Sequence, residues 1–250
     1  MDFIEHIKLL YKTPSELVCG YKEKEILETE NKLGIKFPEV LRTFYLKLGR
    51  HENFINIDED KYLFFIRLDK LNDVGFNKAL SDFYYIAVDD ECNNYYININ
   101  DLNKKNPKVS IFCKTLNMDL NLLNEEFTFI ETVELFLIFL AGWNGIHGGL
   151  KYRTNITKEI STENDFLLNL ENNWIEIKGF RSAHLRMFTS DYKDVIIMSP
   201  SKYPKTNFIG FGSNYEENFN KIKEMVPFII NNNVRRRRGI VDIIQSDKKE

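Results

Sequence analysis

Apolar residues recur at helical spacing at the start of the chain. Residues 3–11 carry them at intervals of one and three positions, which predicts an amphipathic helix. A second helix is predicted over about 22–33, because Gly34 stands where a left-handed residue would end it.

The next segment predicts a corner followed by a third helix. Pro38 suits the first turn of a helix, and Glu39 suits the positive end of its dipole. Apolar residues between 40 and 48 then share one face until Gly49. Residues 31–49 (NKLGIKFPEVLRTFYLKLG) are therefore predicted to form a helix–corner–helix unit with an architectural role.

From residue 62 onward, short apolar runs replace the helical pattern. The segment 95–99 (YYINI) alternates like a strand, and a turn-rich segment at 89–94 (DDECNN) precedes it. Residues 132–141 (TVELFLIFLA) are apolar nearly all round, which predicts a buried helix on the sheet. GWNGIHGG at 142–149 is predicted to end this helix as a flexible connector. The predicted strands cover residues 62–68, 83–88, 95–99 and 109–113.

The second half mixes helical and strand patterns without an internal repeat. A polar, turn-prone stretch at 153–162 opens it, and a short helix is predicted around 166–170. A last helix is predicted to be capped by Ser213 or Asn214. The predicted strands of this half cover residues 174–177, 185–188, 195–198 and 208–211.

Composition indicates a globular protein of the reducing cytoplasm. Of the 250 residues, 43% are hydrophobic and 28% are charged, which is typical of a chain with a sizeable core. The three cysteines stand far apart, so one stays unpaired in any disulfide scheme. The N-terminus has no signal-peptide core, and the longest apolar run is too short to cross a bilayer. We therefore expect a soluble cytoplasmic protein without membrane contact.

The net charge of −3 conceals an uneven distribution. Residues 1–150 carry 17 Lys and Arg against 24 Asp and Glu, a balance of −7, whereas residues 151–250 carry 17 against 13. An acidic half repels phosphate and favours a basic protein partner, because opposite charge steers association. A chance distribution of charged residues explains the same numbers, so the charge asymmetry alone does not identify a partner.

Sequence patterns of the common enzyme classes are absent. The four histidines, at positions 6, 51, 147 and 184, lack any spacing that suits zinc. There is no Gly-x-Ser-x-Gly nucleophile motif. GWNGIHGG lacks the Gly-Lys-Ser/Thr ending of a phosphate loop and follows a helix instead of preceding one. The sequence therefore predicts a protein that is not an enzyme, with no catalytic residue, metal site or cofactor.

The acidic turn beside the tyrosine-bearing strands is the best candidate for a partner surface. Acidic side chains on a hairpin can meet a basic surface, and tyrosine supplies anchor area at low entropic cost. An alternative is a solvated turn with half of the tyrosines in the core, and the acidic segment at 58–60 has the same two interpretations. The predicted partner-binding residues are Asp58, Glu59, Asp60, Tyr84, Asp89, Asp90, Glu91 and Tyr95.

A run of four arginines lies near the C-terminus. Arg235, Arg236, Arg237 and Arg238 form a possible contact for a polyanion. A lone run without interleaved aromatic residues, in a protein with a pI near 5.9, is more typical of a solvated tail. Nucleic acid is therefore not the expected partner.

The corner, the strand pair and the buried helix together resemble the SUKH superfamily, the Smi/Knr-like proteins. The strand pair IAVDDECNNYYINI (86–99) and the helix ending LFLIFLA (135–141) belong to the likeness, which covers roughly residues 15–145. The turn in this chain lacks the glycine expected there. The matching residues of the corner are Glu30, Leu33-Gly34-Ile35, Phe37-Pro38, Phe44 and Gly49.

The resemblance implies an α+β fold, with helices packed on a mainly antiparallel sheet. It implies a Smi/Knr-like domain over residues 1–150. Residues 151–250 are expected to form an additional, smaller α+β lobe with a polar basic tail, either appended or a divergent second copy. Many bacterial members are similar in role to immunity proteins, which neutralise a secreted toxin, and fungal relatives act as protein partners in cell-wall and stress signalling. The family carries no catalytic set onto this chain.

Three functions follow from these observations. The favoured hypothesis is a non-enzymatic immunity protein that binds and neutralises a cognate protein toxin with a basic surface, such as a nuclease or another toxin enzyme. The alternative is a regulatory or scaffold module of cell-wall or stress signalling. A second alternative is a nucleic-acid binder acting through Arg235–Arg238. The sequence leaves the oligomeric state open.

Overall fold

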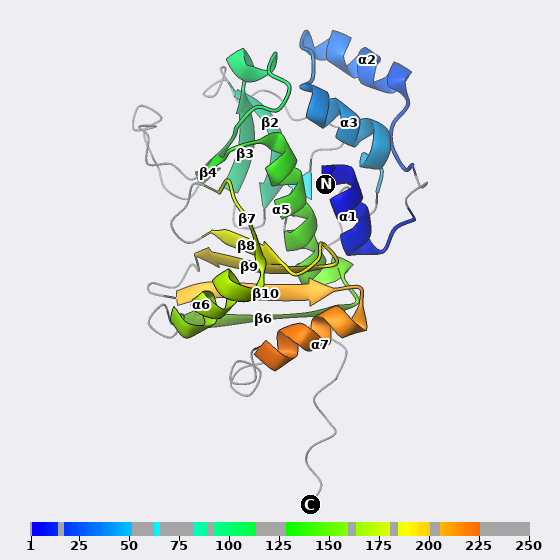
Figure 1. Cartoon of the computed structure of the whole chain (residues 1–250). Coiled ribbons are helices and arrows are strands. Elements are labelled where there is room, and N and C mark those ends of the chain that lie inside the picture. The colour runs from blue at the N-terminus through cyan, green and yellow to red at the C-terminus, as the bar shows by residue number, and fades with distance from the viewer. Residues whose placement is uncertain are drawn as a thin grey trace, which may run out of the picture.

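Three helices form the N-terminal part of the computed structural model (Figure 1). α1 (Phe3–Tyr11) and α2 (Glu23–Leu33) fall where helical spacing predicts them. Gly34 ends α2 with a φ of 67°, which confirms the predicted left-handed cap. α3 (Glu39–Leu48) starts one residue later than predicted, because Pro38 is its N-cap. The structure describes residues 2–14, 18–51, 63–65, 83–89, 93–113, 129–159, 164–180, 185–200 and 206–225.

The first sheet is antiparallel, and its strands lie side by side in chain order. A β-bulge interrupts the pairing of its second and third strands between Tyr85 and Ala87. A short 3-10 helix, η3 (Ile99–Asp101), leads from the third strand toward the fourth. The last strand was not predicted, because two residues are too few to show an alternation. The strands are β1 (Leu63–Phe65), β2 (Phe83–Asp89), β3 (Asn93–Asn98), β4 (Val109–Cys113) and β5 (Phe129–Ile130).

The predicted buried helix is α5 (Val133–Asn144), and Thr132 caps its start. The Thr132 hydroxyl oxygen accepts a hydrogen bond from the Leu135 N–H at 3.2 Å. The predicted end at residue 142 is wrong, because the chain continues into the π-helical turn η5 (Gly145–Gly149). Ile146 in this turn is buried in the core, so the segment is a packed element where a flexible connector was predicted.

The second sheet is also antiparallel, in the order β6-β10-β9-β8-β7. Its first strand was wrongly predicted as a polar, turn-prone stretch. That strand lies at the edge of the sheet and pairs with β10 along its whole length, from Tyr152 opposite Ser213 to Glu159 opposite Thr206. Polar residues are common on such strands. The strands are β6 (Tyr152–Glu159), β7 (Ile175–Ile177), β8 (Arg186–Thr189), β9 (Asp194–Pro200) and β10 (Thr206–Ser213).

Two helices cover one face of the second sheet (Figure 1). α6 (Asn164–Asn173) matches the predicted short helix, and α7 (Glu216–Met225) begins close to its predicted caps. Phe166 and Phe219 from these helices pack with strand residues such as Phe211 in a separate hydrophobic cluster.

The other face of the second sheet packs on α5. A Cβ on Gly142 would lie 2.9 Å from a methyl carbon of Met187 and 3.0 Å from one of Val195, so a side chain there would require these residues of the sheet to shift. On the first sheet, the Tyr95 ring packs 5.1 Å from the Phe136 ring of the same helix. One continuous hydrophobic cluster therefore joins both sheets through α5. The division at residue 150 stays a prediction.

Candidate functional site

The structure places only part of the predicted partner site. Tyr84 and Tyr95 are 3% and 4% exposed and belong to the core, in line with the alternative interpretation of the tyrosine cluster. Asp89 is the last residue of β2. The remaining predicted residues lie outside the described part of the chain: Asp58, Glu59, Asp60, Asp90, Glu91, Arg235, Arg236, Arg237 and Arg238.

The neighbouring tyrosines lie on the opposite face of the first sheet. Tyr85 pairs with Tyr96, Tyr96 pairs with Ser110, and Ser110 pairs with Phe129. Paired residues share one face, and successive residues of a strand alternate, so this row points away from α5. We call Phe83, Tyr85, Tyr96 and Phe129 the aromatic face.

Three rings of the aromatic face contact one another. Tyr96 lies at the centre, with ring centroids 5.2 Å from Tyr85 and 6.2 Å from Phe83. Tyr96 is 6% exposed, whereas the other three rings are half-buried. Burial raises the pKa of the Tyr96 phenol, which therefore stays protonated. At the far side of the sheet the Lys108 ammonium lies 4.3 Å from the centre of the Phe129 ring.

A signal for the aromatic face was present in the sequence. Tyr95 shares the parity of Ile97, and Tyr84 shares the parity of Ile86, so both belong to the apolar face of their strand. The predicted partner site therefore included the inward-facing tyrosine of each pair, Tyr84 and Tyr95. The alternation of positions along β2 identifies Tyr85 as the outward-facing tyrosine of the first pair.

The corner between α2 and α3 is held by a buried carboxylate. Glu30 accepts a hydrogen bond from the Phe37 N–H at 2.9 Å, and the Arg42 Nε lies 3.6 Å from the same oxygen. The corner also reaches the chain between β3 and β4, because the Val40 N–H donates to the Lys105 carbonyl at 3.2 Å. These contacts give the corner a structural role.

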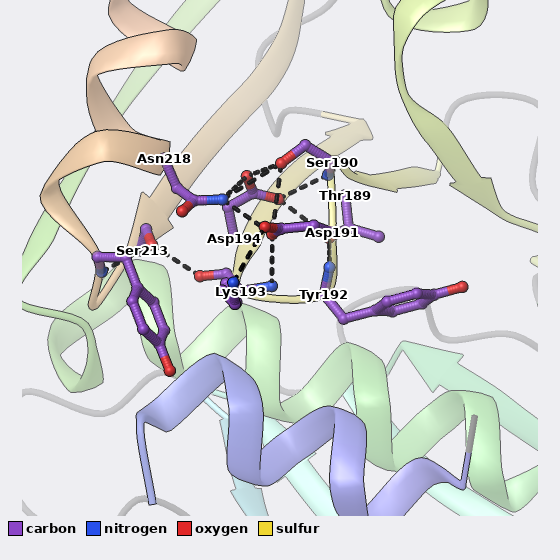
Figure 2. A network of polar contacts seen from close by, with 9 residues as sticks. Thr189, Ser190, Asp191, Tyr192, Lys193, Asp194, Ser213 and Asn218 are labelled. Carbon is purple, nitrogen blue, oxygen red and sulfur yellow. Dashed lines mark hydrogen bonds and ion pairs between the residues drawn. The ribbon is translucent and has the colours of Figure 1, made fainter.

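A polar network closes the turn between β8 and β9 (Figure 2). The fully buried Asp194 accepts hydrogen bonds from the Thr189 hydroxyl at 2.9 Å, from the Ser190 N–H at 2.7 Å and from the Asn218 amide at 3.0 Å. The Ser190 hydroxyl also donates to Asp194. The Asn218 amide additionally donates to Asp191 at 2.8 Å, which ties α7 to the turn. Both carboxylate oxygens of Asp194 accept hydrogen bonds from protein donors, so this side chain connects the β8–β9 turn to α7.

Two histidines with little exposure lie within helical segments, the buried His6 in α1 and the half-buried His147 in η5. His6 of α1 packs edge-on against Tyr192 of the β8–β9 turn, with ring centroids 4.9 Å apart. Burial lowers the pKa of His6 to about 4. Burial, together with the charge of Arg153, likewise lowers the pKa of His147 in η5 to about 4. Both side chains are therefore neutral at pH 7.

The described residues contain neither a metal-binding cluster nor a membrane-spanning helix. Among them, no group of three or more His, Cys, Asp and Glu side chains is arranged to hold a metal ion. No described helix has the length and apolar character needed to span a membrane.

Comparison with known proteins identifies the region that contains the corner and the first sheet. The model of the SMI1 / KNR4 family (SUKH-1) matches residues 20–137. The curated proteins and the solved structures gave no significant match. The matched region runs from just before α2 into α5, and it includes the corner residue Glu30 and the pair of β2 and β3. The match confirms the predicted resemblance to the SUKH superfamily over residues 20–137, where the chain is similar to the SMI1 / KNR4 family, SUKH-1.

Proposed function

We propose that this chain is an immunity protein that binds and neutralises a cognate toxin in the cytoplasm without catalysing a reaction. The observation that carries the proposal is the match to the SUKH-1 family over residues 20–137, a family known for immunity proteins. Neutralisation by binding requires a stable surface that covers the active surface of the toxin.

Charge supports a basic toxin, such as a nuclease or another enzyme that acts on polyanions. Residues 1–150 carry a balance of −7, which would speed association with a positively charged partner. The acidic segments 58–60 and 89–91 remain proposed contact regions for such a partner.

Co-expression tests the function directly. The polypeptide encoded immediately upstream of this chain is expressed in a bacterial host, alone and together with the chain. We expect growth arrest by the upstream polypeptide alone, rescue by the chain, and a complex that survives size-exclusion chromatography. If growth is not rescued and no complex forms, the proposal is wrong. Recovery of a resident signalling or wall-synthesis protein as the partner would favour the regulatory alternative.

A further inference from the structure

Exposed lysines gather where the corner between α2 and α3 meets the chain between β3 and β4. The Lys105 carbonyl accepts a hydrogen bond from the Val40 N–H at 3.2 Å, and the Lys105 ammonium lies 3.0 Å from a carboxylate oxygen of Glu39. These two contacts bring the corner and the β3–β4 connection side by side. We call the exposed lysines of the two segments the lysine surface: Lys32, Lys36, Lys104, Lys105 and Lys108.

Two lysines of this surface already have a carboxylate partner. Lys104 lies 2.8 Å from Asp101, and Lys105 pairs with Glu39. The two lysine side chains are 61% and 72% exposed, so water and salt weaken both ion pairs. Neither ammonium is therefore fixed in its present pairing.

The other three lysines leave the surface with an excess of positive charge. Lys32, Lys36 and Lys108 form no ion pair with any residue that the structure describes, and the Lys108 ammonium packs on the Phe129 ring. Glu134 is the third carboxylate of this region, beside the two that pair with lysines. Five lysines thus stand against three carboxylates, a local balance of +2 in a half of the chain that carries −7 as a whole.

Two helix N-termini add positive potential at the same place. The Val133 N–H of α5 donates to the Pro107 carbonyl at 2.8 Å, and the Glu134 N–H donates to the Asn106 side-chain oxygen at 3.1 Å. The first turn of α3 meets the same connection through the Lys105 carbonyl. The positive ends of both helix dipoles therefore lie against this short segment, which strengthens its attraction for negative charge.

We propose that the lysine surface binds an acidic segment of a second protein partner. Opposite charge steers such a segment to exposed ammonium groups. This inference goes beyond the proposed function, because a basic toxin would be repelled from this surface.

Nucleic acid fits the lysine surface less well than an acidic polypeptide does. Proteins that bind single strands neutralise many phosphates and stack bases on exposed aromatic rings. Among the described residues, the exposed large apolar side chains are all aliphatic: Val18, Leu27, Leu168 and Ile175. The surface therefore offers charge without an exposed ring for stacking.

Binding of a synthetic peptide of about ten glutamates to the full chain tests the proposal. The double variant Lys32→Glu/Lys36→Glu is compared with Lys178→Glu/Lys221→Glu, which makes the same charge change at exposed lysines of the second half. At low salt, we expect Kd to rise about tenfold in the first double variant and to stay within about twofold in the second. Circular dichroism and thermal melts confirm that each variant is folded.

A further variant should strengthen binding. Glu39→Gln removes the carboxylate that pairs with Lys105, so we expect the affinity for the glutamate peptide to rise about two- to threefold. Glu217→Gln is the matched control, since it removes an exposed carboxylate from the first turn of another helix, α7, and it should leave Kd unchanged.

The remaining outcomes would overturn the inference. If the wild-type chain does not bind the peptide, or if both double variants weaken binding equally, the lysine surface is not a docking site. Tighter binding of a single-stranded oligonucleotide of the same charge, lost in Lys32→Glu/Lys36→Glu, would replace the acidic protein partner with nucleic acid.

Discussion

The two sheets of this protein differ in what is described on their two faces. The second sheet packs on α5 with one face and on α6 and α7 with the other. The first sheet packs on α5 with one face, while the opposite face carries the buried Tyr96 and the half-buried rings around it. The second sheet is therefore an internal layer between described helices, whereas aromatic side chains line the second face of the first sheet.

The same difference is visible in the sequences of the strands. Residues 195–198 (VIIM) of β9 are apolar in succession, as expected for a strand buried on both faces. β3 instead carries three successive buried residues, Tyr95, Tyr96 and Ile97, between the polar Asn94 and Asn98. Its outward position is an aromatic residue with a polar hydroxyl, where β9 has only aliphatic residues and methionine.

Substitutions by aspartate on the four faces of the two sheets are expected to lower the free energy of unfolding the most. Ile97→Asp on the first sheet, and Ile197→Asp and Phe211→Asp on the two faces of the second, should each destabilise the protein by more than about 4 kcal/mol, because each buries an unpaired charge. Tyr85→Asp on the aromatic face should cost no more than about 2 kcal/mol, since Tyr85 is only half-buried and water can reach the carboxylate. Urea unfolding measures all four, and a folded Phe211→Asp variant would show that the second sheet is not covered on both faces.

Most helices and strands could be predicted from the sequence because their apolar residues follow the pattern that burial requires. α3 was found by its apolar periodicity, and α5 and β9 were found by their continuous apolar runs, because burial requires apolar residues at those positions. β6 was missed because an edge strand can keep polar residues along its length. β5 was missed because it has only two residues.

The candidate site was harder to predict for a different physical reason. Parity distinguishes the inward Tyr95 from the outward Tyr96, but it does not show which outward residues of different strands meet. The alignment of Tyr85, Tyr96, Ser110 and Phe129 in one row depends on the register of β2 to β5. The Asp194–Asn218 bond likewise joins residues 24 positions apart through tertiary packing.

Loss of the polar network at the β8–β9 turn is expected to give the next largest decrease in stability. Asp194→Ala removes the acceptor for the Thr189 and Ser190 hydroxyls and for the Asn218 amide, so we expect a loss of about 3 kcal/mol. Asp191→Ala is the matched control and should cost about 1 kcal/mol, because Asp191 is only half-buried and water can replace it. Equal losses in the two variants would contradict a specific role for Asp194.

Acid should destabilise the folded protein through His6 in α1 and His147 in η5. The pKa of His6 is about 4 in the folded protein and about 6.5 in the unfolded chain, and the same holds for His147. The unfolded chain therefore binds more protons between pH 6.5 and 4, so stability falls as the pH decreases through this window. Each histidine should contribute a loss of roughly 2 to 3 kcal/mol by pH 4.5.

Chemical denaturation at pH 7.5 and pH 4.5 measures this dependence. His6→Gln removes one titrating group, so the difference in unfolding free energy between the two pH values should shrink by roughly 2 to 3 kcal/mol. Carboxylate titration is common to the variant and the wild type and cancels in the comparison. An unchanged difference would mean that His6 is not held neutral by its packing against Tyr192.

The corner of the family region should give the smallest of these effects, because its buried carboxylate has fewer partners than Asp194. Glu30→Ala leaves the Phe37 N–H without an acceptor and should cost about 2 kcal/mol, whereas Glu30→Gln keeps an acceptor and should cost less than about 1 kcal/mol. Pro38→Ala is the control, since the Pro38 carbonyl still accepts from the Arg42 N–H at 2.9 Å, and it should also cost less than about 1 kcal/mol. Thermal melts rank the three variants. A larger loss for Pro38→Ala than for Glu30→Ala would mean that proline rigidity, and not the Glu30 carboxylate, holds the corner that the first sheet packs against.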